Sequence, residues 1–148
     1  MNAFENDASV HVLLVEDNYG DVRLTIEAFK EIRGDITIHP VTDGVEALQY
    51  LRKEGAYREA MRPDLILLDL NLPRKDGREV LDQIKNDADL KRIPIVVLTT
   101  SAADDDIIQA YDSHANCYIK KPVNMDEFFS VAETIDHFWF RLVRLPPS

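Results

Sequence analysis

Apolar residues along this chain follow two patterns. Five short runs rich in Val, Ile and Leu are typical of buried strands, and the segments between them place apolar residues at helical spacing. Strand and helix therefore alternate five times, without internal repeats. The predicted strands cover residues 10–15, 36–41, 65–69, 93–100 and 117–122, and the predicted helices cover 18–33, 45–51, 80–84, 104–111 and 125–143.

This alternation predicts the α/β class, because consecutive parallel strands are joined by helical crossovers. We predict a flavodoxin-like (βα)5 fold, a doubly wound five-stranded parallel sheet in the order 2-1-3-4-5, with an extended apolar C-terminal helix. Residues 10–143 would form this domain, between a flexible tail at 1–9 and a short tail at 144–148. No output domain is expected, so the output would pass through protein contacts, phosphate relay or self-association.

The segment Leu65–Leu68 is a run of large aliphatic residues that leads into Asp69. Such a run predicts a strand buried on both faces. A carboxylate at its end costs free energy to bury unless another group pairs with it. Asp69 is therefore either the start of a turn, a common place for Asp, or a charged functional group at the edge of the sheet. The segment alone favours neither interpretation.

Polar residues stand at the carboxyl ends of four predicted strands. Each has a simple structural explanation, as a helix cap, a turn hydroxyl or a solvated surface charge. In a doubly wound sheet, however, these strand ends meet at the edge where ligands bind. The residues are Glu16 and Asp17, then Asp69 and Asn71, then Thr99, Thr100 and Ser101, and finally Lys120 and Lys121.

Together these residues predict a metal-dependent phosphoryl site. Neighbouring carboxylates repel one another unless a cation joins them, and a cluster of oxygen ligands suits Mg²⁺. A lysine ammonium group can balance a doubly negative group, and a hydroxyl can hydrogen-bond to its oxygens. Asp69 is then placed as the nucleophile, since a carboxylate that attacks a phosphoryl group forms an acyl phosphate. Mg²⁺ and the lysine would stabilise the charge of the transferred group.

The composition of the chain excludes several further classes of function. The chain has 148 residues and a net charge of −10. This charge argues against non-specific nucleic-acid binding and against adhesion to an anionic membrane. Cys117 is the single cysteine, which excludes an intramolecular disulfide. The polar N-terminus lacks a signal-peptide pattern and no apolar run reaches the length of a membrane span, so we expect a cytoplasmic protein.

Four motifs resemble those of CheY-like receiver domains of two-component response regulators. They occur in the order of that family, and the resemblance extends over about residues 10–140. The motifs are Val15-Glu16-Asp17, the segment from Leu68 to Gly77, Thr99-Thr100-Ser101 and Lys120-Lys121-Pro122. The resemblance implies a stand-alone regulator that accepts a phosphoryl group from a sensor histidine kinase. It also implies a need for Mg²⁺, with Mn²⁺ as a substitute, and catalysis only of the regulator's own phosphorylation and dephosphorylation.

The resemblance gives roles to the matching acidic residues. Asp69 resembles the phosphoacceptor, which also contacts the metal, and Asp17 resembles a direct Mg²⁺ ligand. Glu16 would act through metal-bound water, and the backbone carbonyl of Asn71 would be a further ligand.

Roles on the fourth and fifth predicted strands follow in the same way. Thr99 resembles the switch hydroxyl, and Tyr118 resembles the aromatic switch residue. Lys121, rather than its neighbour Lys120, resembles the phosphate-binding lysine. If the peptide bond before Pro122 is cis, as the family suggests, this bond would aim Lys121 into the site.

A closer resemblance leads to the small Rcp-type regulators, which are partnered with cyanobacterial phytochrome histidine kinases. It rests on residues 16–24 and 98–101 and on Phe138-Trp139-Phe140 in the last predicted helix. The resemblance therefore implies a phytochrome-type kinase as the phosphodonor.

The last predicted helix is more apolar than one sheet-facing stripe requires. That stripe would consist of Phe128, Ala132, Ile135, Trp139 and Leu142. The surplus aromatic residues either widen the core or form an interface. The Rcp-type resemblance implies a homodimer through the last helix, strand 117–122 and helix 104–111. Its contact residues would be Tyr111, Phe129, Phe138, Trp139 and Phe140.

Other functions fit the sequence less well. A constitutive interaction module with this fold is the main alternative, but such a domain usually lacks one of the site residues. An aspartyl-phosphate hydrolase would need a second acid at the position of Asn71. A flavin-binding module would place a phosphate against the acidic loop after the first strand.

Overall fold

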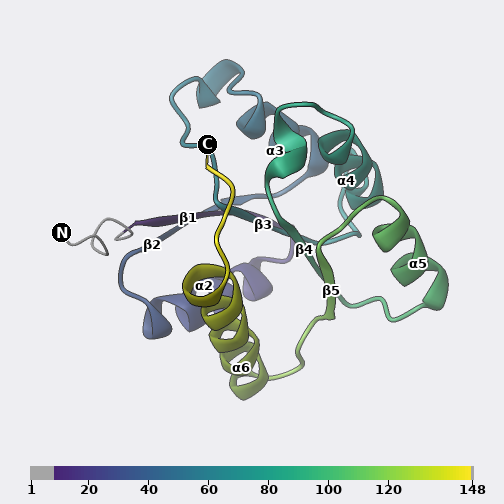
Figure 1. Cartoon of the computed structure of the whole chain (residues 1–148). Helices are drawn as coiled ribbons and strands as arrows, with labels where there is room; N and C mark the ends of the chain where they lie inside the picture. Colours follow the sequence, from purple (N-terminus) through teal and green to yellow (C-terminus); the bar gives the residue numbers. More distant parts are fainter. Residues whose placement is uncertain (1–8, 148) are drawn as a thin grey trace.

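Five parallel strands form one sheet in the order β2-β1-β3-β4-β5 in the computed structural model, which describes residues 9–147 (Figure 1). The strands are β1 (Val10–Val15), β2 (Ile36–Val41), β3 (Leu65–Leu68), β4 (Ile95–Thr99) and β5 (Cys117–Lys120). The predicted strand order is therefore confirmed. The flexible tail predicted at 1–9 lies, except for Ser9, outside the described residues.

Helices cover both faces of the sheet. Figure 1 shows α2 and α6 on one face and α3, α4 and α5 on the other. The helices are α2 (Tyr19–Ile32), α3 (Gly44–Leu51), α4 (Gly77–Lys85), α5 (Asp104–Asp112) and α6 (Met125–Ile135), with short 3-10 turns η1 (Gly55–Tyr57) and η2 (Leu90–Arg92). Between residues 9 and 147, no helix combines the length and the apolar character needed to cross a membrane.

The core has two layers, because successive side chains of a strand point to opposite faces of the sheet. In β1, Leu13 and Val15 belong to the layer under α3 and α4, whereas Val12 and Leu14 belong to the layer under α2 and α6. All side chains of β3 are fully buried in the middle of the sheet. The continuous apolar run of β3 follows from this position, since helices cover both of its faces.

Two glycines bring α3 and α4 close to the chain that follows β3. A Cβ atom at Gly77 would overlap the carbonyl oxygen of Asp69, and one at Gly44 would overlap that of Lys75. Gly77 N also donates a hydrogen bond to the carbonyl oxygen of Leu70 at 2.9 Å. The start of α4 is therefore packed directly against the end of β3, where Asp69 lies.

The C-terminal helix differs from the predicted continuous helix over 125–143. α6 ends at Ile135, and the chain continues as the π-helical segment η3 (Asp136–Leu142). The prediction also placed Leu142 on the sheet-facing stripe, which is wrong, because its side chain is 62% exposed. A π-helical turn is wider than an α-helical turn, so it rotates the residues that follow away from the stripe.

A buried ion cluster accompanies this change of helix type. Asp136 is only 3% exposed, and its carboxylate accepts hydrogen bonds from Arg33 Nε at 2.8 Å and from Arg141 Nε at 2.6 Å. Asp136 and Arg141 are five residues apart, which matches the i→i+5 hydrogen-bond spacing of a π-helix. The cluster joins the end of α2 to η3 and gives the wider turn a physical cause.

Candidate functional site

Three carboxylates from two neighbouring strands meet at the carboxyl edge of the sheet. Glu16 and Asp17 follow β1, and Asp69 follows β3, with each residue's carboxylate offering one oxygen within 4.8 Å of the others. We call these three residues the acidic cluster. Glu16 and Asp69 are 3% and 5% exposed, whereas Asp17 is exposed. Buried carboxylates this close together need a cation to offset their repulsion.

Lys121 supplies one positive charge to the acidic cluster. Its Nζ lies 2.6 Å from Glu16 Oε1, 2.8 Å from Asp21 Oδ2 and 3.2 Å from Asp69 Oδ2. An ammonium group has three N–H donors, and three carboxylates occupy them here. The neighbouring Lys120 is exposed, so Lys121 and not Lys120 contacts the acidic cluster. The phosphate-binding role of Lys121 stays a prediction.

The expected cis peptide bond before Pro122 is wrong, because this bond is trans. Lys121 is placed instead by the end of the sheet. Its backbone N donates to the carbonyl oxygen of Thr99 at 2.7 Å, which continues the pairing of β4 with β5 beyond Lys120.

Burial and charge act against each other in this site. Burial raises the pKa of Glu16 to about 7, although hydrogen bonds from Lys121 and from the backbone N–H of Asn18 oppose the shift. Burial alone would lower the pKa of Lys121, but hydrogen bonds with Asp21 and Glu16 raise it above its ordinary value. Lys121 is therefore charged at neutral pH. The remaining negative charge and the oxygen-only donor set fit a divalent cation of the Mg²⁺ type.

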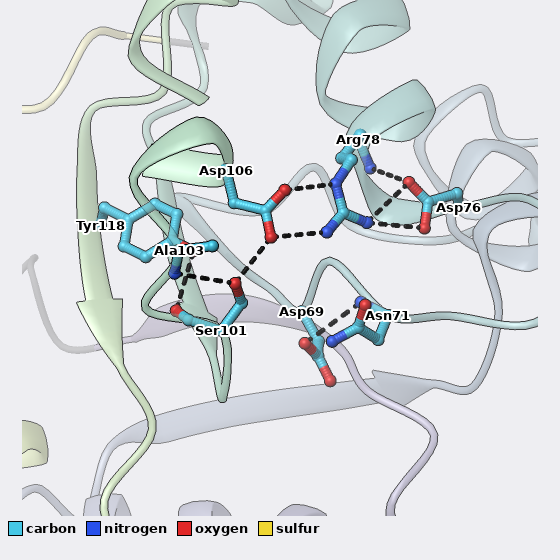
Figure 2. Close-up of polar contacts among 8 residues, drawn as sticks. All are labelled: Asp69, Asn71, Asp76, Arg78, Ser101, Ala103, Asp106 and Tyr118. Carbon is cyan, nitrogen blue, oxygen red and sulfur yellow. Dashed lines mark hydrogen bonds and ion pairs between the residues drawn. The ribbon is translucent and has the colours of Figure 1, made fainter. Parts of the chain in front are cut away.

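Asn71 lies beside Asp69, as Figure 2 shows. Its backbone N is 3.3 Å from Asp69 Oδ1 and donates to it. This contact holds the start of the loop after β3 against the acidic cluster, and the predicted metal ligand is the backbone carbonyl of the same residue. The role of that carbonyl stays a prediction.

Thr99 ends β4 with a hydroxyl group that has no partner. The residue is fully buried, and among residues 9–147 its Oγ1 is the single buried side-chain polar atom without a hydrogen bond. Leaving such a group unpaired costs about 1–3 kcal/mol. This buried donor lies at the end of β4, next to β5 and close to the end of β5 that Lys121 follows. It is therefore suited to hydrogen-bond to a bound group that offers an acceptor oxygen.

A hydrogen-bond network links the loop after β4 to three other elements (Figure 2). Tyr118 Oη, on β5, donates to the Ser101 carbonyl oxygen at 3.0 Å, and Ser101 Oγ donates to Asp106 Oδ2 at 2.6 Å. Arg78, on α4, bridges Asp106 and Asp76 with hydrogen bonds of 2.9 to 3.1 Å. Arg78 and Ser101 lower the pKa of Asp106 by donating to its carboxylate. Tyr118 is therefore tied to the loop that follows Thr99.

Two parts of this arrangement were missed by the sequence reasoning. Asp21 joins Lys121 although it lies on a helix and not at a strand end. Its place in the first turn of the helix that directly follows β1 was the available signal, because that turn begins beside the carboxyl end of the strand. The pair Arg78 and Asp106 connects α4 with α5 over 28 residues, and no local pattern marks it.

The predicted dimer residues are not equally accessible. Tyr111 and Phe138 are 48% and 43% exposed. Phe129, Trp139 and Phe140 are half-buried and pack against the core layer beneath α2 and α6. The surplus aromatic residues therefore divide between the two explanations, since some widen the core and others face solvent. The homodimer stays a prediction.

A doubly wound parallel sheet with an acidic cluster, a buried threonine and a lysine at its carboxyl edge defines a receiver domain. The family model described as response regulator receiver domain matches residues 12–133, and the chain belongs to this family. Particular relatives are the Rcp proteins. Response regulator Rcp1 of Synechocystis sp. is 49% identical to this chain over 137 residues, which cover 93% of each protein.

Solved structures agree with this relationship. The phosphorylated cyanobacterial phytochrome response regulator RcpA is 52% identical over 95% of this chain and 100% of that chain, with a TM-score of 0.91. The Mn²⁺-bound form of response regulator Rcp1 is 48% identical over 93% and 99% of the two chains, with a TM-score of 0.87. Both the receiver resemblance and the closer Rcp-type resemblance are thus confirmed.

Proposed function

We propose that this chain is a stand-alone response regulator that accepts a phosphoryl group from a sensor histidine kinase onto Asp69. The observation that carries the proposal is the surroundings of this carboxylate. Asp69 is buried beside Glu16 and next to the exposed Asp17, and its Oδ2 lies 3.2 Å from Lys121 Nζ. A buried carboxylate in such a site can act as a nucleophile toward a phosphoryl group.

The transfer of the phosphoryl group from the kinase histidine to Asp69 needs no further reactant. A carboxylate oxygen of Asp69 attacks the phosphorus atom, the P–N bond to the kinase histidine breaks, and the histidine nitrogen leaves with the bonding electrons. Lys121 balances negative charge on the phosphoryl oxygens. Asp69 then carries an acyl phosphate, which water hydrolyses, so the chain catalyses only its own phosphorylation and dephosphorylation.

A divalent cation, Mg²⁺ or Mn²⁺, would be held by Asp17 and Asp69, by Glu16 through water, and by the Asn71 carbonyl. When bound, it would neutralise charge on the transferred group and on the carboxylates. Support for this assignment comes from the oxygen-only donor set within 4.8 Å and from the Mn²⁺-bound form of the relative Rcp1.

The signal would leave the site through Thr99 and Tyr118. The unpaired Thr99 hydroxyl would donate to a phosphoryl oxygen and draw the following loop with it. Because the Tyr118 hydroxyl donates to Ser101 in that loop, this movement would release or re-aim the tyrosine. The surface of α5, β5 and α6 would then change between two states and bias self-association.

The partner is proposed from the relatives. RcpA is described as a phytochrome response regulator, and Rcp1 shares nearly half of its sequence with this chain. We therefore propose a phytochrome-type histidine kinase as phosphodonor and a homodimer through the last helix. The work of such a regulator would take place in the cytoplasm, without nucleic acid or membrane as a partner.

Incubation with acetyl phosphate and Mg²⁺ tests the proposal. Intact mass spectrometry should show the gain of one phosphoryl group, and Asp69→Asn should abolish it because an amide is a poor nucleophile. Asp82→Asn, a substitution of an exposed residue on α4, is the matched control and should be phosphorylated like the wild type. A wild-type chain that gains no mass, or an Asp69→Asn variant that still does, contradicts the proposed function.

A further inference from the structure

We propose that Asp21 is a positioning residue that restrains Lys121 and thereby limits how readily Asp69 takes up a phosphoryl group. This inference rests on the proposed function and assigns a role to a residue outside the acidic cluster. It predicts that removing the charge of Asp21 makes phosphorylation easier, which is the opposite of damage to the site.

The side chain of Asp21 is dedicated to Lys121. Its Oδ2 lies 2.8 Å from Lys121 Nζ, closer than Asp69 Oδ2 at 3.2 Å. Within α2, Asp21 makes hydrogen bonds only through its backbone, since its N donates to Asn18 Oδ1 at 2.9 Å and its carbonyl oxygen accepts from Thr25 Oγ1 at 2.7 Å. Among the contacts of residues 9–147, Lys121 is the one partner of the Asp21 carboxylate.

Asp21 competes with an incoming phosphoryl group for the donors of Lys121. All three N–H groups of this ammonium are taken by Glu16, Asp21 and Asp69. A phosphoryl oxygen on Asp69 can replace the Asp69 contact, but a second oxygen needs another donor. The Asp21 side chain is 25% exposed, against 4% for Glu16, so Asp21 can turn toward water at the lower cost.

The negative charge of Asp21 also opposes the binding of a phosphoryl group at Asp69. The acidic cluster already contains three carboxylates for one lysine, and a phosphoryl group brings further negative charge. A fourth carboxylate next to Lys121 offsets the positive charge that would attract this group. Glu16 and Asp69 still hold Lys121 when Asp21 is changed, so the lysine stays aimed at the site.

Asp21→Asn tests the inference, because the amide keeps an oxygen acceptor but removes the charge. We expect the concentration of acetyl phosphate that gives half-maximal phosphorylation to fall by about threefold to tenfold, in line with the strength of one charge-assisted hydrogen bond partly lost. Calorimetric binding of beryllofluoride in Mg²⁺ should tighten by a similar factor. Mg²⁺ binding alone should be unchanged or weaker, since a cation loses a nearby negative charge.

Tighter beryllofluoride binding without tighter Mg²⁺ binding would show that Asp21 restrains Lys121. If Asp21 only kept the site folded, its substitution would weaken the binding of both ligands. Glu27→Gln is the matched control: it removes one charge from the same helix, where Glu27 pairs with Arg23 at 3.1 Å on the exposed surface. It should change neither affinity by more than about twofold. Asp21→Ser gives a second neutral variant that is compatible with the start of a helix.

The outcomes distinguish the two proposals. A wild-type chain that takes up no phosphoryl group overturns the proposed function. A phosphorylated wild type whose folded Asp21→Asn and Asp21→Ser variants need as much acetyl phosphate, or more, overturns the role of Asp21 and leaves the proposed function intact.

Discussion

Replacing Thr99 by Val should stabilise the folded chain. Thr99 is fully buried at the end of β4, and its Oγ1 has no hydrogen-bond partner. Valine has nearly the same shape, is equally β-branched and suits a strand. The substitution therefore removes an unsatisfied hydroxyl group without opening a cavity in the core.

The expected gain follows from the burial of this one group. An unpaired buried hydroxyl costs about 1–3 kcal/mol, and burying a methyl group in its place is favourable by about 0.8 kcal/mol. Small adjustments of packing reduce the sum, so we expect the free energy of unfolding to rise by about 1–2 kcal/mol. For a domain of this size, that gain corresponds to a Tm increase of about 3–6 °C.

Urea unfolding of the unphosphorylated chain, followed by circular dichroism, measures this effect. Thr25→Val is the matched control, because Thr25 is also buried but its Oγ1 donates to the carbonyl oxygen of Asp21 at 2.7 Å. The same substitution there should lower the free energy of unfolding by about 1 kcal/mol. If Thr99→Val destabilises the chain as much as Thr25→Val does, the Thr99 hydroxyl has a partner before phosphorylation and the reasoning is refuted.

Two further predictions concern the C-terminal segment. Burial alone would raise the pKa of Asp136, but hydrogen bonds from Arg141 and Arg33 lower it. Its contribution to stability is therefore present above its unfolded pKa of about 3.9 and lost as the pH falls through the folded value. Asp136→Asn should cost about 2 kcal/mol in urea unfolding at pH 7 and progressively less as the pH falls below about 3.9, and a cost that does not change with pH would contradict this. Phe138→Ala should weaken the proposed dimer, measured by size-exclusion chromatography with light scattering at tens of micromolar, whereas Met61→Ala, another exposed apolar side chain, should not; a wild type that is monomeric with and without beryllofluoride would exclude the dimer.

The sheet and its site edge could be predicted because the relevant information is local. Each strand is a contiguous apolar run between polar segments, and the number and alternation of these runs restrict the possible topologies. Once the strands are parallel, their carboxyl ends fall on one edge. Asp69, Thr99 and Lys121 are therefore brought together by topology, although 52 residues separate the first from the last.

The remaining features depend on tertiary contacts that no local pattern encodes. The change from α6 to η3 follows from the burial of Asp136 between Arg33 and Arg141, and Arg33 lies 103 residues away. The cis bond before Pro122 was taken from the family resemblance and is wrong, because this bond is trans, and the hydrogen bond from Lys121 N to the Thr99 carbonyl oxygen positions the lysine. The role of Asp21 was not predicted because this residue lies on a helix and not at a strand end, and only the fold brings its carboxylate to Lys121.

β5 connects the proposed chemistry with the proposed output. Tyr118 lies on this strand and Lys121 directly after it, three residues apart, so their side chains leave the sheet on opposite faces. Tyr118 packs against the core layer under α3 and α4 and binds the carbonyl oxygen of Ser101, whereas Lys121 binds the acidic cluster. The backbone N of Lys121 is in turn bonded to Thr99. A phosphoryl group that binds Lys121 and Thr99 would therefore pull on the two segments that the Tyr118–Ser101 hydrogen bond joins. These segments are the end of β5 and the loop after β4. In the proposed function, β5 and the loop after β4 would carry the change from Asp69 to the surface formed by α5 and α6.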